Sequence, residues 1–347
     1  MWLPISLTDS LIMKVKTQKY FIATVAAMSI VCSCKTISID TPKTETLPPI
    51  GFSNVSTKAT VDDVKTNGFG VWAYINNDLV SNLLIMDNTK VRYNTSTSSW
   101  EYSPLRYWID ESVFTFLAAY PNEGFTFDPG NSSLNLTLAE TPSQVDYMVA
   151  TNITDTSEDF SETVDLQFKH ILTSVRLNIW RDHGKHQNDQ MRIRKVTLSN
   201  IQKGGTYSSN TDRWAVSNER LTMEKVYEGG SDEDNIGAAQ VNDNGTLETI
   251  TRLGPADPFN DMMLVPQTLD GSSPVSLKIQ YELKRQNAAD WEIAELETVL
   301  PSVTWEPNRR YTYNVVLSSV TDITVYYIQT KVDPWGTPQV GGTVIIK

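Results

Sequence analysis

Cysteine and histidine are scarce in this sequence, which has two cysteines and three histidines among 347 residues. The cysteines, Cys32 and Cys34, are separated by one residue, and a disulfide bond between them would be strained. No histidine lies near them, so a zinc site is not expected there either. The rest of the chain must therefore fold around an apolar core, without disulfide or zinc cross-links.

The histidines do not indicate a catalytic or metal-binding role. His170 lies in a strand-like segment, and we interpret it as a packed or hydrogen-bonded residue. His183 and His186 lie in the polar turn 181–189, whose aspartates could bind a metal weakly. A solvated hairpin loop is the favoured interpretation of that turn.

Motifs of known catalytic or ligand-binding chemistry are also missing. The acidic segments 231–235 and 242–245 lack the spacing of a calcium-binding loop, and we interpret them as solvated loops. The sequence has no Gly-x-Ser-x-Gly elbow, no phosphate-binding loop and no His-Glu-x-x-His motif. We therefore predict no catalytic residue, no metal site, no cofactor and no enzymatic activity.

Basic residues are outnumbered, with 29 Lys and Arg against 41 Asp and Glu and a formal net charge of −12. Binding to nucleic acid is not expected, because it needs clustered cations. The same surface repels anionic lipids, so any attachment to a membrane has to use something other than a basic patch. Composition nevertheless favours a folded chain, with 40% hydrophobic residues, 9 Trp, 14 Tyr and 10 Phe.

A long apolar run occurs near the N-terminus, over residues 20–31. Lys14, Lys16 and Lys19 precede it and small residues follow it. This order is typical of an export signal, and the run is too short to span a bilayer comfortably. We predict a signal peptide over residues 1–34, starting at either Met1 or Met13.

Cys34 is the candidate lipidation site. Ser33 before it and Val31 three positions before it resemble a bacterial lipobox, in which the cysteine is acylated, although Cys32 is less typical of that motif. We expect a protein anchored to a membrane by this lipid, with signal cleavage without lipidation as the alternative. Residues 35–49 are polar with three prolines, and we expect them to form a tether.

From Ile50 onward, apolar residues mostly alternate with polar ones, and no stretch of twelve or more residues shows helical periodicity. Alternation places one side of each segment inward, as a half-buried strand requires. Gly, Pro and Asn separate the segments, which predicts an all-β fold of antiparallel sandwiches. The expected strands cover 71–75, 83–86, 113–120, 164–168, 175–180, 275–283, 311–315 and 323–326.

The chain is long enough for two domains. The acidic, turn-rich stretch 155–162 is the expected boundary. It divides the chain into an N-terminal domain, 50–160, and a C-terminal domain, 161–347.

The aromatic residues allow a second hypothesis about function. A flat platform for carbohydrate could be built from Trp72, Trp100, Trp108, Tyr102 and Tyr107. Because alternation turns many of these rings inward, packing in the core is the favoured interpretation.

Seven segments together resemble a known family in their order along the chain. They are 68–74 (Gly-Phe-Gly-Val-Trp-Ala-Tyr), 107–108, 116–121, 146–150, 168–172, 264–267 and 305–313. The sequence resembles the fimbrillin family of Bacteroidales-type bacteria, also called type V pilins, over most of the mature chain. One departure is Asn308, which stands where glycine is expected.

The resemblance implies a lipoprotein with two tandem transthyretin-like β-sandwich domains that serves as a fimbrial subunit in cell adhesion. In typical members a trypsin-like protease removes the first strand, and a strand of another subunit fills the groove. This agrees with physical expectation, because a missing strand leaves unpaired backbone groups and an open apolar groove.

Two segments fit these roles. Residues 50–55 alternate and precede Lys58, a candidate cleavage site, with Lys65 as a second; Lys58 could equally be an ordinary loop lysine. The candidate donor strand, which follows Gly341 and Gly342, consists of Thr343, Val344, Ile345 and Ile346. It could equally be the last strand of its own domain.

The expected partners are other pilin subunits, the processing protease and the outer membrane, together with a host protein or glycan. The alternative is a surface lipoprotein that does not polymerise and binds glycan or host protein through exposed aromatics.

Overall fold

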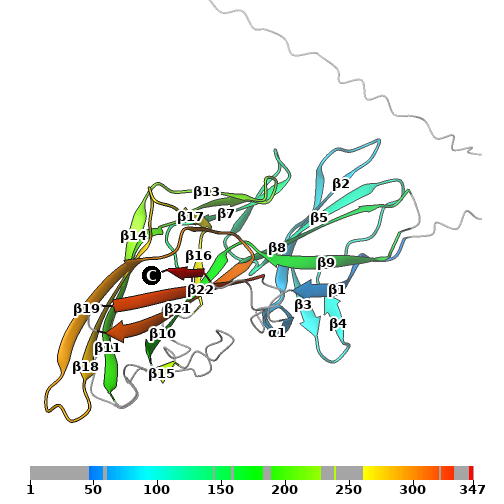
Figure 1. Cartoon of the computed structure of the whole chain (residues 1–347). Coiled ribbons are helices and arrows are strands. Elements are labelled where there is room, and N and C mark those ends of the chain that lie inside the picture. The colour runs from blue at the N-terminus through cyan, green and yellow to red at the C-terminus, as the bar shows by residue number, and fades with distance from the viewer. Residues whose placement is uncertain are drawn as a thin grey trace, which may run out of the picture. The chain divides into compact units, whose positions relative to one another are not determined.

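The computed structural model describes residues 47–57, 61–143, 145–157, 160–182, 189–227, 238–239, 261–319, 322–331 and 344–346 (Figure 1). The predicted signal peptide, Cys34 and the tether up to residue 46 lie outside the described residues. So do Lys58, His183, His186, the segments 231–235 and 242–245, and Thr343.

The described residues form strands and one short helix, α1 (Val61–Asn67). The strands are β1 (Gly51–Thr57), β2 (Phe69–Asn76), β3 (Leu83–Asn94), β4 (Ser99–Glu101), β5 (Val113–Tyr120), β6 (Phe125–Asp128), β7 (Ser133–Leu138), β8 (Met148–Asp155), β9 (Thr163–His170), β10 (Thr173–Asp182), β11 (Gln190–Gln202), β12 (Gly205–Ser208), β13 (Arg213–Val216), β14 (Arg220–Val226), β15 (Ala238–Ala239), β16 (Met262–Leu264), β17 (Gln267–Leu269), β18 (Ser276–Lys284), β19 (Glu292–Val299), β20 (Val303–Trp305), β21 (Arg309–Ser319), β22 (Asp322–Lys331) and β23 (Val344–Ile346). The predicted all-β class is confirmed, and each expected strand overlaps an observed one.

The short helix α1 was not predicted, because seven residues are too few to show a helical period. One buried residue, Val64, fastens it to the core. The helix ends where the Gly68 N–H donates to the Val64 carbonyl at 2.8 Å, with Gly68 at φ 75°. A Cβ at Gly68 would lie 2.4 Å from the Val91 carbonyl oxygen, so only glycine fits there.

A seven-stranded sheet in the order β1-β9-β8-β5-β2-β3-β4 organises the first half of the chain. Its central strands β2 and β5 are buried along almost their whole length. Phe69, Val71 and Phe116 point into one core cluster, whereas Trp72 and Leu117 point into another on the opposite face. The sequences of β2 and β5 are therefore apolar at successive positions, because both faces of the sheet are covered.

The second face is covered by a four-stranded sheet in the order β13-β12-β7-β6. Strands β12 and β13 form a hairpin, and β12 pairs antiparallel with β7 from Gly205–Leu138 to Ser208–Asn135. Residues from the second half of the sequence thus complete the core of the first half.

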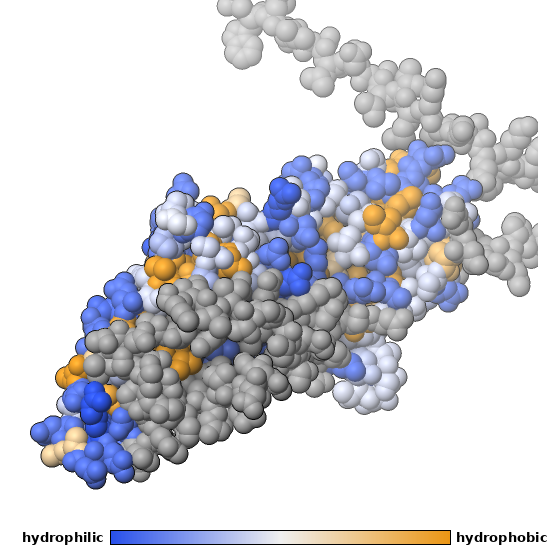
Figure 2. All heavy atoms as spheres, in the orientation of Figure 1, coloured by the Kyte–Doolittle hydropathy of each residue, from blue (hydrophilic) through white to orange (hydrophobic). Residues whose placement is uncertain are grey.

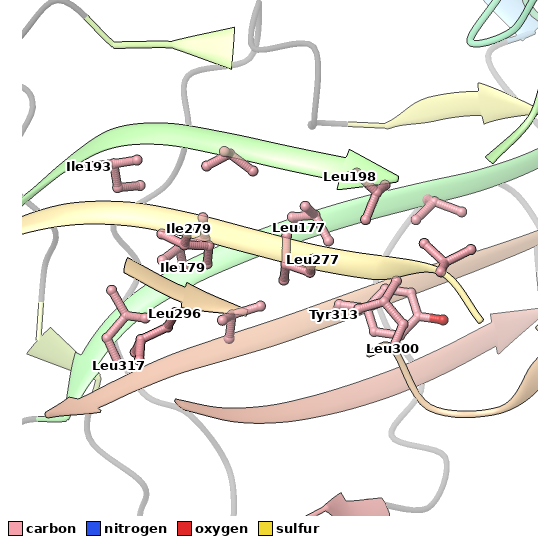
Figure 3. Close-up of a cluster of buried hydrophobic side chains, with 14 of the residues drawn as sticks. Leu177, Ile179, Ile193, Leu198, Leu277, Ile279, Leu296, Leu300, Tyr313 and Leu317 are labelled. Carbon is pink, nitrogen blue, oxygen red and sulfur yellow. The ribbon is translucent and has the colours of Figure 1, made fainter. Parts of the chain in front are cut away.

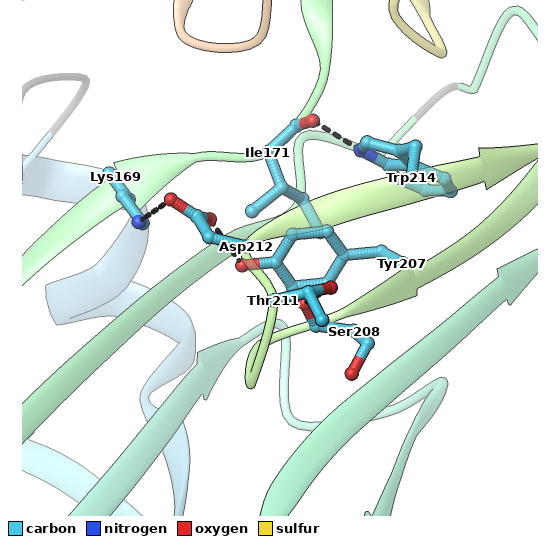
Figure 4. Close-up of polar contacts among 7 residues, drawn as sticks. All are labelled: Lys169, Ile171, Tyr207, Ser208, Thr211, Asp212 and Trp214. Carbon is cyan, nitrogen blue, oxygen red and sulfur yellow. Dashed lines mark hydrogen bonds and ion pairs between the residues drawn. The ribbon is translucent and has the colours of Figure 1, made fainter.

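Polar contacts fasten this hairpin to the end of β9 (Figure 4). The buried Tyr207 hydroxyl donates to the Asp212 carboxylate at 2.8 Å, and Lys169 pairs with the same carboxylate. The Trp214 indole donates to the Ile171 carbonyl at 2.7 Å. Burial, and then the hydrogen bond to Asp212, raises the pKa of Tyr207, so the hydroxyl stays a donor at neutral pH.

The second half builds one core from two sheets (Figure 3). One sheet has the order β15-β10-β21-β22-β23, with β16 also paired to β10, and the other has the order β14-β11-β18-β19. Along β18 the side chains at 277, 279, 281 and 283 are fully buried, and their neighbours are partly exposed. This is the predicted alternation of a half-buried strand.

The outward side chains of this second sheet form ion pairs. The Glu282 carboxylate lies 2.5 Å from Arg192 and 2.7 Å from Arg194. Burial raises the pKa of Glu282, but the hydrogen bonds from the two arginines outweigh it and lower the pKa overall. Figure 2 shows hydrophilic residues over much of the described surface on the face that it draws, with smaller hydrophobic areas between them.

The predicted boundary stretch, 155–162, connects β8 to β9, and both strands belong to the seven-stranded sheet. Residues after 160 thus supply strands to the cores of both halves. The division at residue 160 stays a prediction, as does the transthyretin-like form of the two domains.

The departure at Asn308 has a conformational explanation. Asn308 has φ 58°, in the left-handed region, and its N–H donates to the Leu172 carbonyl at 2.9 Å. Asparagine is among the few residues other than glycine that adopt this conformation readily. The turn holds Trp305 against β21, where the buried Trp305 indole donates to the Tyr313 hydroxyl at 2.8 Å.

Replacing Asn308 tests this explanation. The Asn308→Ala variant should lower the free energy of unfolding by about 1 kcal/mol, because alanine is strained at positive φ. The Asn308→Gly variant should match or exceed the parent. Urea unfolding of the three proteins measures this, and an alanine variant as stable as the glycine variant would contradict it.

Buried tyrosines predict a loss of stability at high pH. Burial raises the pKa of Tyr281 to about 12, whereas an unfolded tyrosine ionises near about 10. Between these values the folded state keeps a proton that the unfolded state loses, so stability falls as pH rises from about 10 towards 12. The Tyr281→Phe variant should show a shallower decline in unfolding free energy over that range, measured by urea titration at stepped pH. An unchanged slope would contradict the assignment.

Candidate assembly interface

Strand β1 is the candidate interface element, because it lies at the edge of the seven-stranded sheet among the described residues. It runs parallel to β9, with Gly51 opposite Thr163 and Phe52 opposite Val164. The register then shifts between Ser53 and Ser56. The Ser53 hydroxyl donates to the Asp165 carboxylate at 2.8 Å and lies 2.8 Å from the Thr163 hydroxyl.

Three apolar side chains of this region enter the core. Ile50 is 1% exposed, Phe52 is 6% exposed and Val55 is 9% exposed. They are spaced by two and then three residues, because the register shift inserts one residue between Phe52 and Val55. A strict alternation would have turned position 55 outward.

Phe52 packs among three aromatic rings. Its ring centroid lies 6.0 Å from that of Phe69, 5.6 Å from that of Tyr102 and 6.2 Å from that of Phe116. All three pairs have steep interplanar angles, which is the edge-to-face arrangement that aromatic rings favour.

The residues directly before β1, Pro49 and Ile50, contact the segment 102–108. The Tyr102 hydroxyl donates to the Ile50 carbonyl at 2.8 Å, and the Ile50 N–H donates to the Arg106 carbonyl at 2.8 Å. Pro49 forms an isolated bridge with Tyr107. We call the space between β9 and residues 102–108 the β1 slot. Nothing in the sequence analysis pointed to the segment 102–108 as its second wall.

Lys58 follows the last residue of β1 directly but lies outside the described residues. Lys65 lies in the last turn of α1, exposed, with its ammonium group 4.8 Å from the centroid of the Tyr93 ring. Proteases of the trypsin type bind extended substrate, so Lys65 would first have to leave the helix. Cleavage after Lys58 and cleavage after Lys65 both stay predictions.

Of the candidate donor strand, Val344, Ile345 and Ile346 form β23, which pairs antiparallel with β22 of the same chain. Tyr326 lies opposite Ile345 in this register. The pairing within the chain matches the alternative in which this segment is the last strand of its own domain, and donation to a neighbour stays a prediction.

The aromatic residues that suggested a carbohydrate platform mostly belong to the core. Trp72 is 2% exposed and Trp108 is 3% exposed, which confirms the packing interpretation for both. Trp100 and Tyr102 are half-buried against the core cluster that contains Trp108, and Tyr107 is 52% exposed. Of the five, only Tyr107 has an exposed ring.

His170 is buried, and its Nδ1 lies 2.8 Å from the Asp146 carboxylate. The interpretation as a hydrogen-bonded residue is confirmed. A neighbouring ionic cluster, which the sequence did not predict, joins Asp261 to Arg176 and to Arg310, the latter at 3.2 Å. Burial lowers the pKa of Arg310, and the charge of Asp261 opposes that shift.

Comparison with known families decides which family the chain is part of. Residues 57–335 match the model of the family described as Fimbrillin-like. The chain belongs to the fimbrillin-like family. The match begins at Thr57, so nearly all of β1 precedes it.

One of the solved structures similar to this fimbrillin-like protein, with a TM-score of 0.62, supports its fold. A fimbrial protein from Bacteroides vulgatus is 19% identical with a TM-score of 0.62, covering 82% of this chain and 99% of that one. A candidate cell adhesion protein from Bacteroides ovatus is 16% identical with a TM-score of 0.47, covering 84% and 99%. Another from Bacteroides uniformis is 14% identical with a TM-score of 0.44, covering 83% and 97%. A comparison with curated proteins found no match.

Within the part of the chain that the structure describes, no helix is long and apolar enough to cross a membrane.

The contribution of Phe52 to stability can be measured in the uncut protein. The Phe52→Ala variant should lose about 3–5 kcal/mol of unfolding free energy, because it empties a pocket among three rings. Leu79→Ala is the matched control, since Leu79 is 90% exposed, and it should change stability by less than about 0.5 kcal/mol. Equal losses in the two variants would show that β1 is not part of the cooperative core.

Proposed function

We propose that this fimbrillin-like protein is a structural subunit of a fimbria on the cell surface, serving cell adhesion. It is exported as a lipoprotein, held in the outer membrane through Cys34, and assembled by strand exchange after a trypsin-like protease cuts behind β1. Membership in the fimbrillin-like family supports a structural role rather than a catalytic one.

The observation that carries the proposal is the position of β1. It is an edge strand, yet its side chains Phe52 and Val55, and Ile50 directly before it, are buried in the core. Removing β1 would uncover Phe69, Phe116 and the neighbouring apolar side chains, and would leave the backbone of β9 unpaired on one side. An open apolar slot beside an unpaired strand favours capture of a strand from another chain.

Cleavage at Lys58 would also separate the subunit from its anchor. The predicted lipid on Cys34 is connected to the core only through the tether and β1, since both precede Lys58 in the sequence. A cut subunit therefore keeps its attachment to the membrane or to its neighbours only through a strand in the slot.

The candidate donor, Thr343 to Ile346, would have to leave β22 to reach a neighbour. Its described part, β23, is three residues long and lies at the end of its sheet order. A short edge pairing costs less to give up than a central one, because fewer hydrogen bonds and contacts are lost.

The alternative, a surface lipoprotein that does not polymerise and binds glycan or host protein through its aromatics, has less support. Trp72 and Trp108 are buried, and Tyr107 alone of the five residues is exposed. A host protein or glycan stays a proposed partner of the assembled fimbria.

Limited trypsin digestion of the mature protein tests the assembly mechanism. A cut after Lys58 should yield a shortened chain that forms a ladder of SDS-resistant multimers on unboiled gels. The Lys58→Gln variant should not form the ladder, whereas Lys65→Gln should behave like the parent. A chain that is cut after Lys58, stays monomeric and takes up no added strand peptide would contradict strand exchange and favour the surface binder.

A further inference from the structure

We infer that the β1 slot selects a donor strand with an aromatic residue at the position of Phe52, and that its preferred donor is therefore a different subunit rather than residues 343–346 of a second copy. This inference rests on the proposed strand exchange. It adds what kind of partner donates the strand, which is defined by the side chains that the slot accepts.

The first step is the shape of the pocket that Phe52 fills. Phe69 and Phe116 are fully buried and contact the Phe52 ring from two sides, and Tyr102 closes the pocket from the segment 102–108. The Tyr102 hydroxyl donates to the carbonyl of Ile50, the residue directly before β1. The pocket walls are thus rings set edge-to-face around a flat side chain, and an aliphatic side chain cannot reproduce those contacts.

The second step is the spacing of the buried positions. The slot takes an aliphatic residue at position 50, the aromatic at 52 and an aliphatic residue at 55. The hydroxyl of Ser53, the residue after the aromatic position, donates to the Asp165 carboxylate of the paired strand β9. The register shift after Ser53 fixes the three-residue step, so a strand with uniform alternation meets only part of the slot.

The third step is the comparison with the candidate donor of this chain. Val344 and Ile346 have the two-residue spacing of Ile50 and Phe52, so Ile346 would take the aromatic position. Isoleucine is smaller than phenylalanine, is branched at Cβ and has no ring, and it would leave part of the pocket unfilled. If the donor strand is shifted by one residue, Ile345 lies at position 50 or position 52, and no aromatic side chain lies at the other position.

The consequence is a ranking of donors. A strand with the pattern aliphatic, any, aromatic, small hydroxyl, any, aliphatic fills the slot completely and runs parallel to β9. A second copy of this chain fills it less well. The slot thereby discriminates against self-assembly and in favour of a subunit with an aromatic donor strand.

The test uses the full mature chain, cut after Lys58 in the Lys65→Gln background and freed of the β1 fragment, with binding of labelled peptides measured by fluorescence anisotropy. The first pair of probes is the peptide of residues 47–57 and the same peptide with Ile50→Phe and Phe52→Ile together. The second pair is the peptide of residues 340–347 and its Ile346→Phe variant. The uncut chain, with its slot occupied, is the control.

We expect the doubly exchanged peptide to bind at least about tenfold more weakly than the parent 47–57 peptide, although its composition is identical. We expect Ile346→Phe to tighten binding of the 340–347 peptide by about tenfold. Equal affinities within both pairs would overturn the selection while leaving strand exchange intact. Failure of all four peptides to bind the cut chain would overturn strand exchange itself, and the inference with it.

If the cut chain does not stay folded without its β1 fragment, a second measurement tests the inference. The β1 fragment is left in place after cleavage, and labelled 47–57 peptide is added. The fragment of a Phe52→Ile chain should be replaced about tenfold faster than that of the parent, because weaker packing mostly raises the rate of dissociation. Equal replacement rates would overturn the inference.

Discussion

Burial of both faces of one sheet is the constraint on which the first half of this molecule depends. The side chains of β2 and β5 are apolar in both directions, so each face has to be covered by something else. Apolar surface left in contact with water is unfavourable in proportion to its area, and neither face can stay open. The hairpin β12–β13 helps to cover one face, and the core on the other face includes buried side chains of β1, an edge strand of the same sheet.

The hairpin and β1 are connected to the rest of the fold in different ways. The hairpin β12–β13 reaches the sheet from the second half, pairs with β7, and is fastened by the contacts of Tyr207, Asp212 and Trp214. It lies between β11 and β14 in the chain, so no single cut frees it. Strand β1, in contrast, precedes the rest of the fold and is followed directly by Lys58. The cores on the two faces of one sheet thus include both the hairpin β12–β13 and the candidate assembly strand β1.

Much of this architecture could be predicted from local sequence pattern. Alternation is a property of neighbouring residues, so β9, β10 and β18 were predicted, and core packing was the favoured interpretation of the aromatic set that includes Trp72 and Trp108. Features that depend on distant partners were not evident. The helix α1 is too short to show a period, and the second wall of the β1 slot, Tyr102 and Arg106, meets Ile50 only after folding. The pairing of β12 with β7 joins residues about seventy positions apart and has no local sequence signature. The expected boundary at residue 160 therefore does not predict which strands contribute to which sheet.

The orientation of β1 has a mechanical consequence. Because β1 runs parallel to β9, a strand seated in its place and pulled along its own axis loads its backbone hydrogen bonds in shear, all at once, rather than one after another as in unzipping. The ring of Phe52 sits between aromatic walls and would have to slide past them in the same step. In the proposed strand exchange, a joint of this geometry would resist tension along the strand far better than peeling across it, as a fibre stretched between a cell and a surface requires.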